Sequence, residues 1–270
     1  MIYLKQFDNL SDYEAYVASE NFIAPNVSFV TDLQEGEEVK YVKEAPTETR
    51  LVCKYNITTT GVKHIVNEYA DPQDCFTEIE IDGVVQPITA KTYNFTTTGE
   101  HTAKFTLKDP TTITDGIFEF NEDDESMRIM TAVTIPNGVT TISSLAFRYN
   151  LALENVTIPN TVTIIEEGCF SDTAIKTLVI PEGLITIKSQ AFQYCNVESI
   201  TFPSTLETIE YEAFDMCSYL SSITCLATTA PEVEFDAFPG GRSGTLRVPT
   251  GSDYSSWLSE LGSGWQIEYI

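Results

Sequence analysis

A repeated unit of 22 or 23 residues is the feature of this sequence that most restricts its fold. From Val133 onward the chain aligns with itself in four units, 133–155, 156–177, 178–199 and 200–222, and a degenerate fifth unit covers 223–245. Four prolines, at 136, 159, 181 and 203, are each followed eleven residues later by a phenylalanine, at 147, 170, 192 and 214. A single unit of this length cannot bury its own apolar side chains, so the repeat predicts a solenoid of stacked units.

Each unit divides into a strand and a turn. Leu153, Val156 and Ile158 have the spacing of a short strand, which ends at Pro159 because proline has no N–H to continue a ladder. In the same unit Val162, Ile165 and Phe170 follow at intervals of three and five residues. This spacing predicts a helical or 3₁₀ turn that buries one edge of the unit.

These residues resemble a known family. The pattern I-x-I-P-x-x-V/L-x-x-I-x-x-x-A-F-x-x-C/N is similar to the BspA-type leucine-rich repeat of bacterial and protist surface proteins, and the resemblance covers roughly residues 105–270. It implies a right-handed solenoid with a parallel sheet on its concave face and short helical turns outside. It also implies a role in adhesion or protein binding, and it brings no catalytic residues.

The ends of the repeat array depart from the pattern. The segment Ile113–Phe118 matches Ile142–Phe147, but six extra residues follow it, and they fall in the acidic stretch 121–126. This stretch lacks the spacing of a calcium-binding loop, so we expect a solvated insertion.

Residues 246–270 contain a possible short helix around Trp257 and a final strand. We interpret them as a C-terminal cap over the last open edge of the solenoid.

Residues 46–109 show the alternation of antiparallel strands, at 51–57, 79–81 and 103–107, with a hairpin signal at Asp82-Gly83. The stretch 98–109 resembles the last strand of bacterial immunoglobulin-like domains. We therefore expect a mixed α/β chain in which an immunoglobulin-like antiparallel β-sandwich abuts the first repeat and starts its sheet. The predicted parts are a head segment (1–45), the sandwich (46–109), the repeats (110–245) and the cap (246–270).

The charge of the chain excludes several partners. With 40 Asp and Glu against 15 Lys and Arg, the formal net charge is −25, which opposes binding to nucleic acid and docking on an anionic membrane. No apolar run is long enough to cross a bilayer, and the first residues do not read as a signal peptide. We expect a cell-surface, extracellular or phage-virion protein. A signal peptide removed from the sequence and a cytoplasmic location both stay open.

The cysteine and histidine residues of the sequence give no indication of a catalytic or metal-binding site. Six Cys without a C-x-x-C pair predict free buried thiols, with Cys169 and Cys225 in the core. Cys195 and Cys217 occupy the same repeat position as Asn150, which favours a buried polar ladder over a disulfide. His64 and His101 are expected on the surface. We expect no metal, no cofactor and no catalytic residue, because nucleophile, phosphate-binding and metalloprotease motifs are all missing.

The outward strand positions form the candidate site. They make a low-charge strip on the concave face, and the residues are Asn155, Thr157, Thr177, Val179, Ser199, Thr201, Ser222 and Thr224. Threonine also suits exposed strands by propensity, so the strip has a purely structural explanation as well. We expect a non-enzymatic protein that binds a host or bacterial surface protein or glycan. The alternatives are a structural spacer or virion component, and an unrecognised carbohydrate-active enzyme.

Overall fold

The computed structural model describes residues 50–120, 125–240 and 242–270. Residues 50–270 form one compact unit, separate from residues 1–49. The predicted head segment and the acidic residues 121–124 therefore lie outside the described part. Because one unit holds everything from Arg50 onward, the boundaries proposed at 109/110 and 245/246 stay an interpretation of the sequence.

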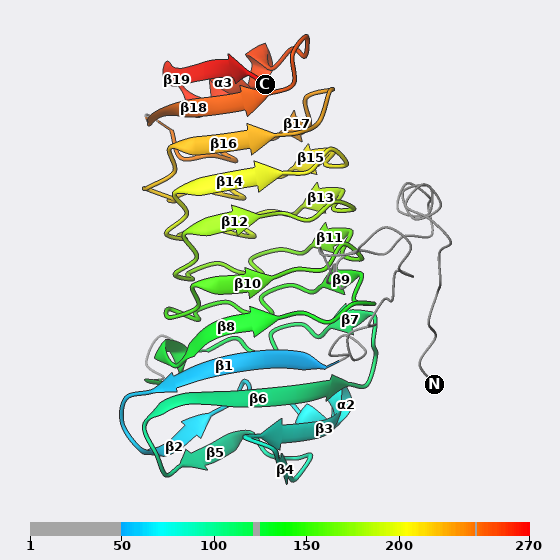
Figure 1. Cartoon of the computed structure of the whole chain (residues 1–270), viewed down its shortest axis with the longest axis vertical. Helices are drawn as coiled ribbons and strands as arrows, with labels where there is room; N and C mark the ends of the chain where they lie inside the picture. Colours follow the sequence, from blue (N-terminus) through cyan, green and yellow to red (C-terminus); the bar gives the residue numbers. More distant parts are fainter. Residues whose placement is uncertain (1–49, 121–124, 241) are drawn as a thin grey trace, which may run out of the picture. The chain divides into compact units, whose positions relative to one another are not determined.

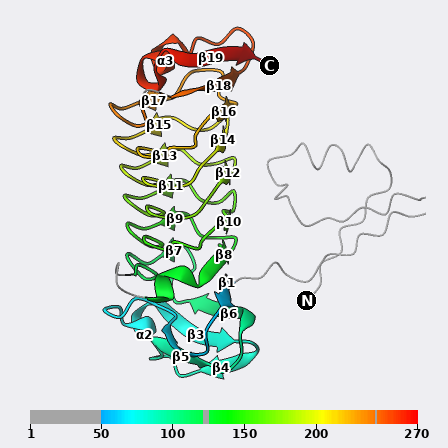
Figure 2. The same ribbon diagram turned by 90° about the vertical axis from the view of Figure 1, so that its left-hand side faces the viewer.

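Two rows of strands run along the length of this unit (Figures 1 and 2). Neighbouring strands of the front row pair in parallel, as the family resemblance implied, except between the strands at 155–157 and 177–179. The front row contains β8 (Met130–Thr134), β10 (Asn155–Thr157), β12 (Thr177–Val179), β14 (Ser199–Phe202), β16 (Ser222–Cys225) and β18 (Ser243–Val248). The back row contains β7 (Thr112–Ile113), β9 (Thr141–Ile142), β11 (Ile164–Ile165), β13 (Thr186–Ile187), β15 (Thr208–Ile209) and β17 (Glu232–Val233).

The back row corrects the prediction of helical turns and of a mixed α/β chain. Described residues include only two short α-helices and one 3₁₀ helix, η1 (Glu125–Arg128), so the fold is mostly β. Two residues per unit, such as Gln190 and Tyr194, have φ near +60°, which no right-handed helix accommodates. Backbone N–H groups of the back row therefore bond to the neighbouring repeat, as Lys188 N does to Ile165 O at 3.0 Å, rather than within their own turn.

Six phenylalanine rings stack along the axis of the solenoid. Successive centroids lie 5.2 to 5.6 Å apart with interplanar angles of 3° to 10°. The stack includes the irregular first unit and the degenerate last one, and the rings are Phe118, Phe147, Phe170, Phe192, Phe214 and Phe238. All six are buried, so each ring receives its apolar surroundings from the units on either side.

An antiparallel region covers the first repeat. β1 (Leu51–Ile57) pairs with β8 of the solenoid on one side and with β6 (Gly99–Leu107) on the other. The sheet continues through β3 (Phe76–Ile81), which follows the short helix α2 (Pro72–Cys75), to β4 (Val84–Gln86). Asp82 and Gly83 make the predicted hairpin turn, both with positive φ. The inference that this region starts the sheet of the solenoid is confirmed.

A second, smaller layer lies against this sheet. It is the antiparallel pair β2 (Gly61–His64) and β5 (Thr92–Phe95). The Phe95 ring packs against Tyr55 of β1, and the Tyr55 hydroxyl donates to the Ile65 carbonyl. The sheet that contains β6 is continuous with the solenoid, and its partner layer has two strands. The predicted immunoglobulin-like sandwich is not confirmed by this arrangement.

The last repeat is covered by α3 (Ser255–Leu261) and β19 (Gly264–Tyr269), the helix and strand expected there. β19 pairs in parallel with β18. Two buried aromatic residues of this region hold the degenerate fifth unit. Trp257 Nε1 donates to the Pro231 carbonyl at 2.9 Å, and the Tyr254 hydroxyl donates to the Ala227 carbonyl at 2.7 Å.

The predicted polar ladder is confirmed, and all six cysteines are free and buried. Each side chain of the ladder donates to the carbonyl of the stacked phenylalanine one repeat earlier. Asn150 bonds to Phe118 O, Cys195 to Phe170 O and Cys217 to Phe192 O, at 2.8, 3.1 and 3.1 Å. Thr173 occupies the position in the remaining unit and contacts Cys195 Sγ at 3.2 Å.

Glycine and threonine alternate where each unit turns after its proline. The Thr205 hydroxyl accepts from Gly183 N at 3.0 Å and donates to Leu184 O at 2.9 Å. Thr161 makes the same two bonds to the unit before it, with Gly138 N and Val139 O. Each threonine therefore links its unit to the preceding one, because its hydroxyl bonds to an N–H group and a carbonyl group of the preceding turn.

We expect Phe192→Ala to lower the free energy of unfolding by about 3–5 kcal/mol, because it removes a ring that contacts two neighbours and leaves a cavity. Chemical denaturation followed by circular dichroism measures the change. The matched control is Phe235→Ala, since Phe235 is 70% exposed and should cost little. Equal effects of the two substitutions would contradict the stacked core.

Gly183 and Gly138 allow a second test of how the units stack. Both have φ near +107°, but a Cβ on Gly183 would lie 2.4 Å from Asn160 O, whereas on Gly138 it would lie 3.7 Å from Pro110 O. We expect Gly138→Ala to cost about 1–3 kcal/mol through backbone strain alone. Gly183→Ala should cost about 1–3 kcal/mol more through overlap with the neighbouring unit. Thermal unfolding of the two variants should separate these contributions, and equal melting temperatures would exclude the overlap.

Candidate functional site

The outward side of the front row is free of charged residues over five strands. We call this surface the sheet face. On each strand the residue between two outward positions points into the core, as Leu178, Ile200 and Ile223 do with 0–2% exposure. The outward residues are Ala132, Thr134, Asn155, Thr157, Thr177, Val179, Ser199, Thr201, Ser222 and Thr224.

All eight residues predicted for the site lie on the sheet face, in two columns. Strand register aligns Thr177, Ser199 and Ser222 in one column, and Val179, Thr201 and Thr224 in the other. On β10, Asn155 and Thr157 align with Ala132 and Thr134 of β8. The four residues on β10 and β12 are exposed, and the four on β14 and β16 are half-buried.

The sheet face contains a seam that the repeat alignment does not predict. In the described part of the chain, no backbone hydrogen bond joins β10 to β12, so these strands belong to two different sheets. At the same level of the solenoid the back row is continuous from β9 through β11 to β13. Val179, 66% exposed, stands next to this seam. The predicted strip is therefore two segments, with Asn155 and Thr157 on one and the other six residues on the next.

Ion pairs border the sheet face at both ends. Arg247 on β18 bonds to Ser222 Oγ at 3.1 Å and to Glu268 at 2.9 Å. On the antiparallel strands, Lys54 pairs with Glu100 and Arg50 with Glu80, both at 2.9 Å. Sequence reasoning missed these residues. The alternation of Arg247 with the buried Leu246 and Val248 would have placed its side chain on the sheet face.

A hollow of about 590 Å³ opens beside the degenerate fifth unit, where Leu226 replaces the repeat proline. The loop Ala227–Pro231 forms one wall, and Gly183, Ile185 and the segment Ser204–Glu207 form the rest. Glu207 is its single carboxylate. The hollow therefore does not supply the two carboxylates that glycoside hydrolysis uses.

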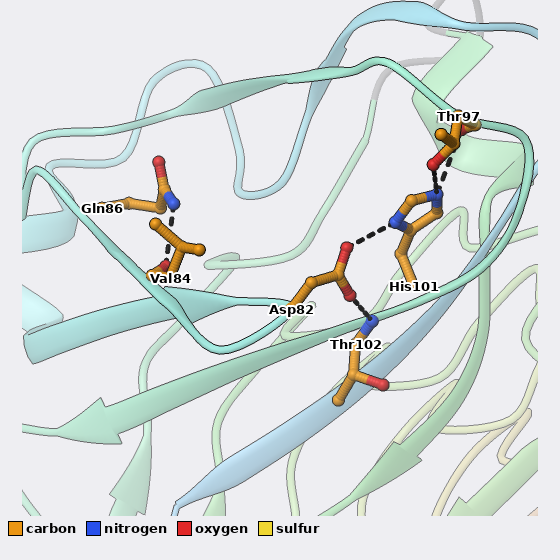
Figure 3. A network of polar contacts seen from close by, with 6 residues as sticks. All are labelled: Asp82, Val84, Gln86, Thr97, His101 and Thr102. Atoms are coloured by element: carbon orange, nitrogen blue, oxygen red, sulfur yellow. Dashed lines mark hydrogen bonds and ion pairs between the residues drawn. The ribbon is translucent and has the colours of Figure 1, made fainter.

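His101 is buried, with 8% exposure, which corrects the prediction of a surface histidine. It has the same parity on β6 as Ala103, Phe105 and Leu107, and this alternation could have indicated its direction. Figure 3 shows its ring between Asp82 and Thr97. His101 Nδ1 lies 2.5 Å from Asp82 Oδ2, and Nε2 lies 3.1 Å from the Thr97 carbonyl.

Both partners of this ring are hydrogen-bond acceptors, so the protonated imidazolium satisfies both. The hydrogen bond to Asp82 raises the pKa of His101, and the Thr97 carbonyl adds to this effect. Partial burial acts to raise the pKa of Asp82, but hydrogen bonds from His101 and from Thr102 N outweigh it and lower that pKa. The pair holds the β3–β4 turn against β6. Neither of its two side chains is a nucleophile.

This fold is a leucine-rich-repeat solenoid, in which parallel repeats share a phenylalanine stack and a polar ladder. The family model described as "BspA type Leucine rich repeat region" matches residues 89–221 in six copies. The repeat region of this chain belongs to this BspA-type leucine-rich repeat family. No curated protein sequence matches the chain.

Solved structures of bacterial leucine-rich repeat proteins are similar to part of the chain. A leucine-rich repeat protein of T. pallidum is 22% identical over 50% of this chain and 61% of its own, with a TM-score of 0.34. One from Bacteroides ovatus is 14% identical over 59% and 57%, with a TM-score of 0.34. A leucine-rich cell surface protein of Faecalibacterium prausnitzii is 20% identical over 53% and 61%, with a TM-score of 0.27. The chain thus spans about three fifths of the length of these proteins.

Two further observations concern only the residues that the structure describes. None of their helices is long and apolar enough to cross a membrane. No group of three or more His, Cys, Asp or Glu side chains among them is placed to hold a metal ion.

The pair His101–Asp82 predicts a pH-dependent stability. A raised pKa on His101 stabilises the fold below the unfolded value of about 6.5, and this contribution is lost as pH rises through the folded value. A lowered pKa on Asp82 stabilises the fold above about 3.9, and this contribution is lost as pH falls through the folded value. We expect the stability difference between the parent and His101→Gln to be largest between about pH 4 and 6.5. Urea unfolding at several pH values measures it, and a difference that stays constant from pH 5 to 8 would contradict the pairing.

Proposed function

We propose that this chain is a non-enzymatic binding protein whose sheet face docks a protein or a glycan at a bacterial or phage surface. The observation that carries the proposal is the uncharged character of the sheet face. Ten outward residues on five successive strands include no acid and no base, on a chain with a net charge of −25.

The acids of the repeats lie elsewhere. Residues 111–270 hold 22 Asp and Glu but only 6 Lys and Arg, and the described acids among them lie in the turns, next to strand ends, in the helices, and on β17 and β19. Such an exterior keeps the protein soluble and repels anionic surfaces. A partner meets the least repulsion on the sheet face, where hydroxyl groups and the Asn155 amide can donate and accept hydrogen bonds.

The family supports the same role, since BspA-type repeats are typical of surface adhesion and binding proteins. In our proposal the antiparallel strands before the repeats act as a cap that continues the sheet, and the charged pairs at the ends of the sheet face limit the docking area. The immunoglobulin-like character of residues 46–109 stays a prediction. The proposal includes no catalytic step.

A screen of the whole chain against glycan and host-protein arrays tests the proposal, followed by variants of the sheet face. We expect Thr157→Glu with Thr201→Glu to weaken binding of a ligand found in the screen about tenfold or more, because two buried, unpaired charges would enter the interface. The matched control is Thr114→Glu with Ser144→Glu, which adds the same charge to the outer turns.

Unchanged affinity of the sheet-face variant would exclude this face as the binding surface. Equal losses in the two variants would indicate a general charge effect and would also count against it. If the arrays yield no ligand at all, the result favours a structural spacer over a binding protein.

A further inference from the structure

The turns of the last three units, including the degenerate fifth unit, carry exposed apolar side chains. We call Tyr194, Tyr211, Met216 and Phe235 the outer-edge patch. Their exposed fractions are 52%, 42%, 50% and 70%. They lie outside the phenylalanine stack, on the turns that follow the back-row strands β13, β15 and β17. Exposed apolar clusters of this kind mark interaction surfaces more often than isolated residues do.

The repeat itself supplies an internal comparison. Tyr211 and Phe235 stand three residues before their stacked phenylalanines, and the four earlier units have Asp115, Ser144, Glu167 and Ser189 at this position. The fold therefore accepts polar residues there. The change to aromatic residues is confined to the last two units, so it does not follow from the requirements of the turn.

Tyr194 and Met216 stand two residues after their stacked phenylalanines, with φ of 59°, a left-handed conformation that Gly, Asn and Asp adopt with the least strain. The two earlier units have Tyr149 and Asp172 at this position, with φ of 61° and 58°. The position accepts a polar residue as well as an aromatic one, so the turn does not require the apolar side chains of Tyr194 and Met216.

Hydrogen bonds join the turn that carries Tyr194 to the turn that carries Tyr211 and Met216. Gln190 N donates to the Tyr211 carbonyl at 3.1 Å, and Tyr194 N donates to the Asp215 carbonyl at 3.0 Å. Between them the Gln193 amide donates to Glu212 at 3.0 Å and to Asp215 at 3.3 Å. The patch is thus interleaved with carboxylates that are already fixed in place.

These carboxylates lie on turns that carry no basic residue. Segments 207–216 and 231–238 hold seven acids and no Lys or Arg. Glu210 is paired with Lys188 at 2.6 Å, but Glu212 is held by the neutral amide of Gln190 at 2.7 Å and Glu234 by Tyr211 N at 2.9 Å. The hydrogen bond from Tyr211 contributes most to lowering the pKa of Glu212. In the described part of the chain no ion pair reaches Glu212, Asp215 or Glu234, so the patch has a strongly negative potential.

We propose that the outer-edge patch docks a basic peptide segment of a partner protein, in which Lys or Arg side chains alternate with apolar ones. Basic groups would pair with Glu212 and Glu234 and stack on the Tyr211 and Phe235 rings, while the apolar side chains cover the aromatic surface. This surface is separate from the sheet face and does not depend on the function proposed for it.

Fluorescence anisotropy of two labelled peptides on the full chain tests the proposal. Both peptides have twelve residues and six lysines, alternating with leucine in one and with serine in the other. We expect the Lys/Leu peptide to bind at least about tenfold more tightly than the Lys/Ser peptide. Tyr211→Ser with Phe235→Ser should remove this preference, while Glu212→Gln with Glu234→Gln should weaken both peptides and reduce the salt dependence.

Matched controls separate the patch from general attraction to an acidic protein. Val84→Ser with Val85→Ser removes two valines that are 59% and 61% exposed on β4, and it should leave the preference intact. Glu154→Gln with Glu198→Gln changes the net charge equally, away from the patch, and should have a smaller effect than the Glu212 and Glu234 variant. Circular-dichroism melts check that every variant is folded.

Three results would overturn the proposal. One is equal binding of the two peptides by the parent chain. Another is a preference that survives in the Tyr211 and Phe235 variant or is lost equally in the valine control. The third is a chitosan oligomer of equal charge that binds as tightly and with the same dependence on the patch, since this would assign the surface to a cationic glycan. The sheet-face variant Thr157→Glu with Thr201→Glu should not alter the peptide preference, so the two proposals can fail separately.

Discussion

Stacking of one buried phenylalanine per repeat is the interaction on which the rest of this structure depends. Rings 5.2 to 5.6 Å apart match the spacing of about 4.8 Å between paired strands closely enough for both rows to form ladders. No unit is complete without a neighbour, so both ends of the stack need a cover. β1 covers the first front-row strand, and Trp257 packs against the ring of Phe238 at the other end.

Because of this arrangement, whole columns of surface residues are not required for the stability of the fold. Inward positions repeat the same few apolar residues, and the polar ladder and the alternating Gly and Thr hold the units together through backbone groups. Outward positions can then differ from unit to unit at little cost. The uncharged sheet face and the acidic, partly aromatic outer edge are two such surfaces on one solenoid, and they suit partners of different chemistry.

Much of the fold could be predicted because every unit repeats the same pattern of inward and outward residues. The front strands, the buried ladder at Asn150, Cys195 and Cys217, the free thiols and the outward positions of the candidate site all follow from register and parity. Helical turns were expected because Val162, Ile165 and Phe170 fit a helical spacing. That prediction is wrong because bonds between units, and left-handed residues such as Gln190, replaced the bonds within a helix. The prediction of a surface position for His101 is wrong because its parity with Ala103 on β6, and not its polarity, sets the direction of its side chain.

The sequence alone determined the length of the repeat, the residues of each repeat that face inward and the absence of charge on the outward strand positions, because each of these features recurs in every repeat. Only the tertiary structure decided the features that arise between repeats or outside them. These are the seam between β10 and β12, the pairing of β1 with β8, the pair His101–Asp82 and the contacts that place Tyr211 beside Glu234. Each depends on distances between residues far apart in the chain, and a periodic pattern contains no information about such distances.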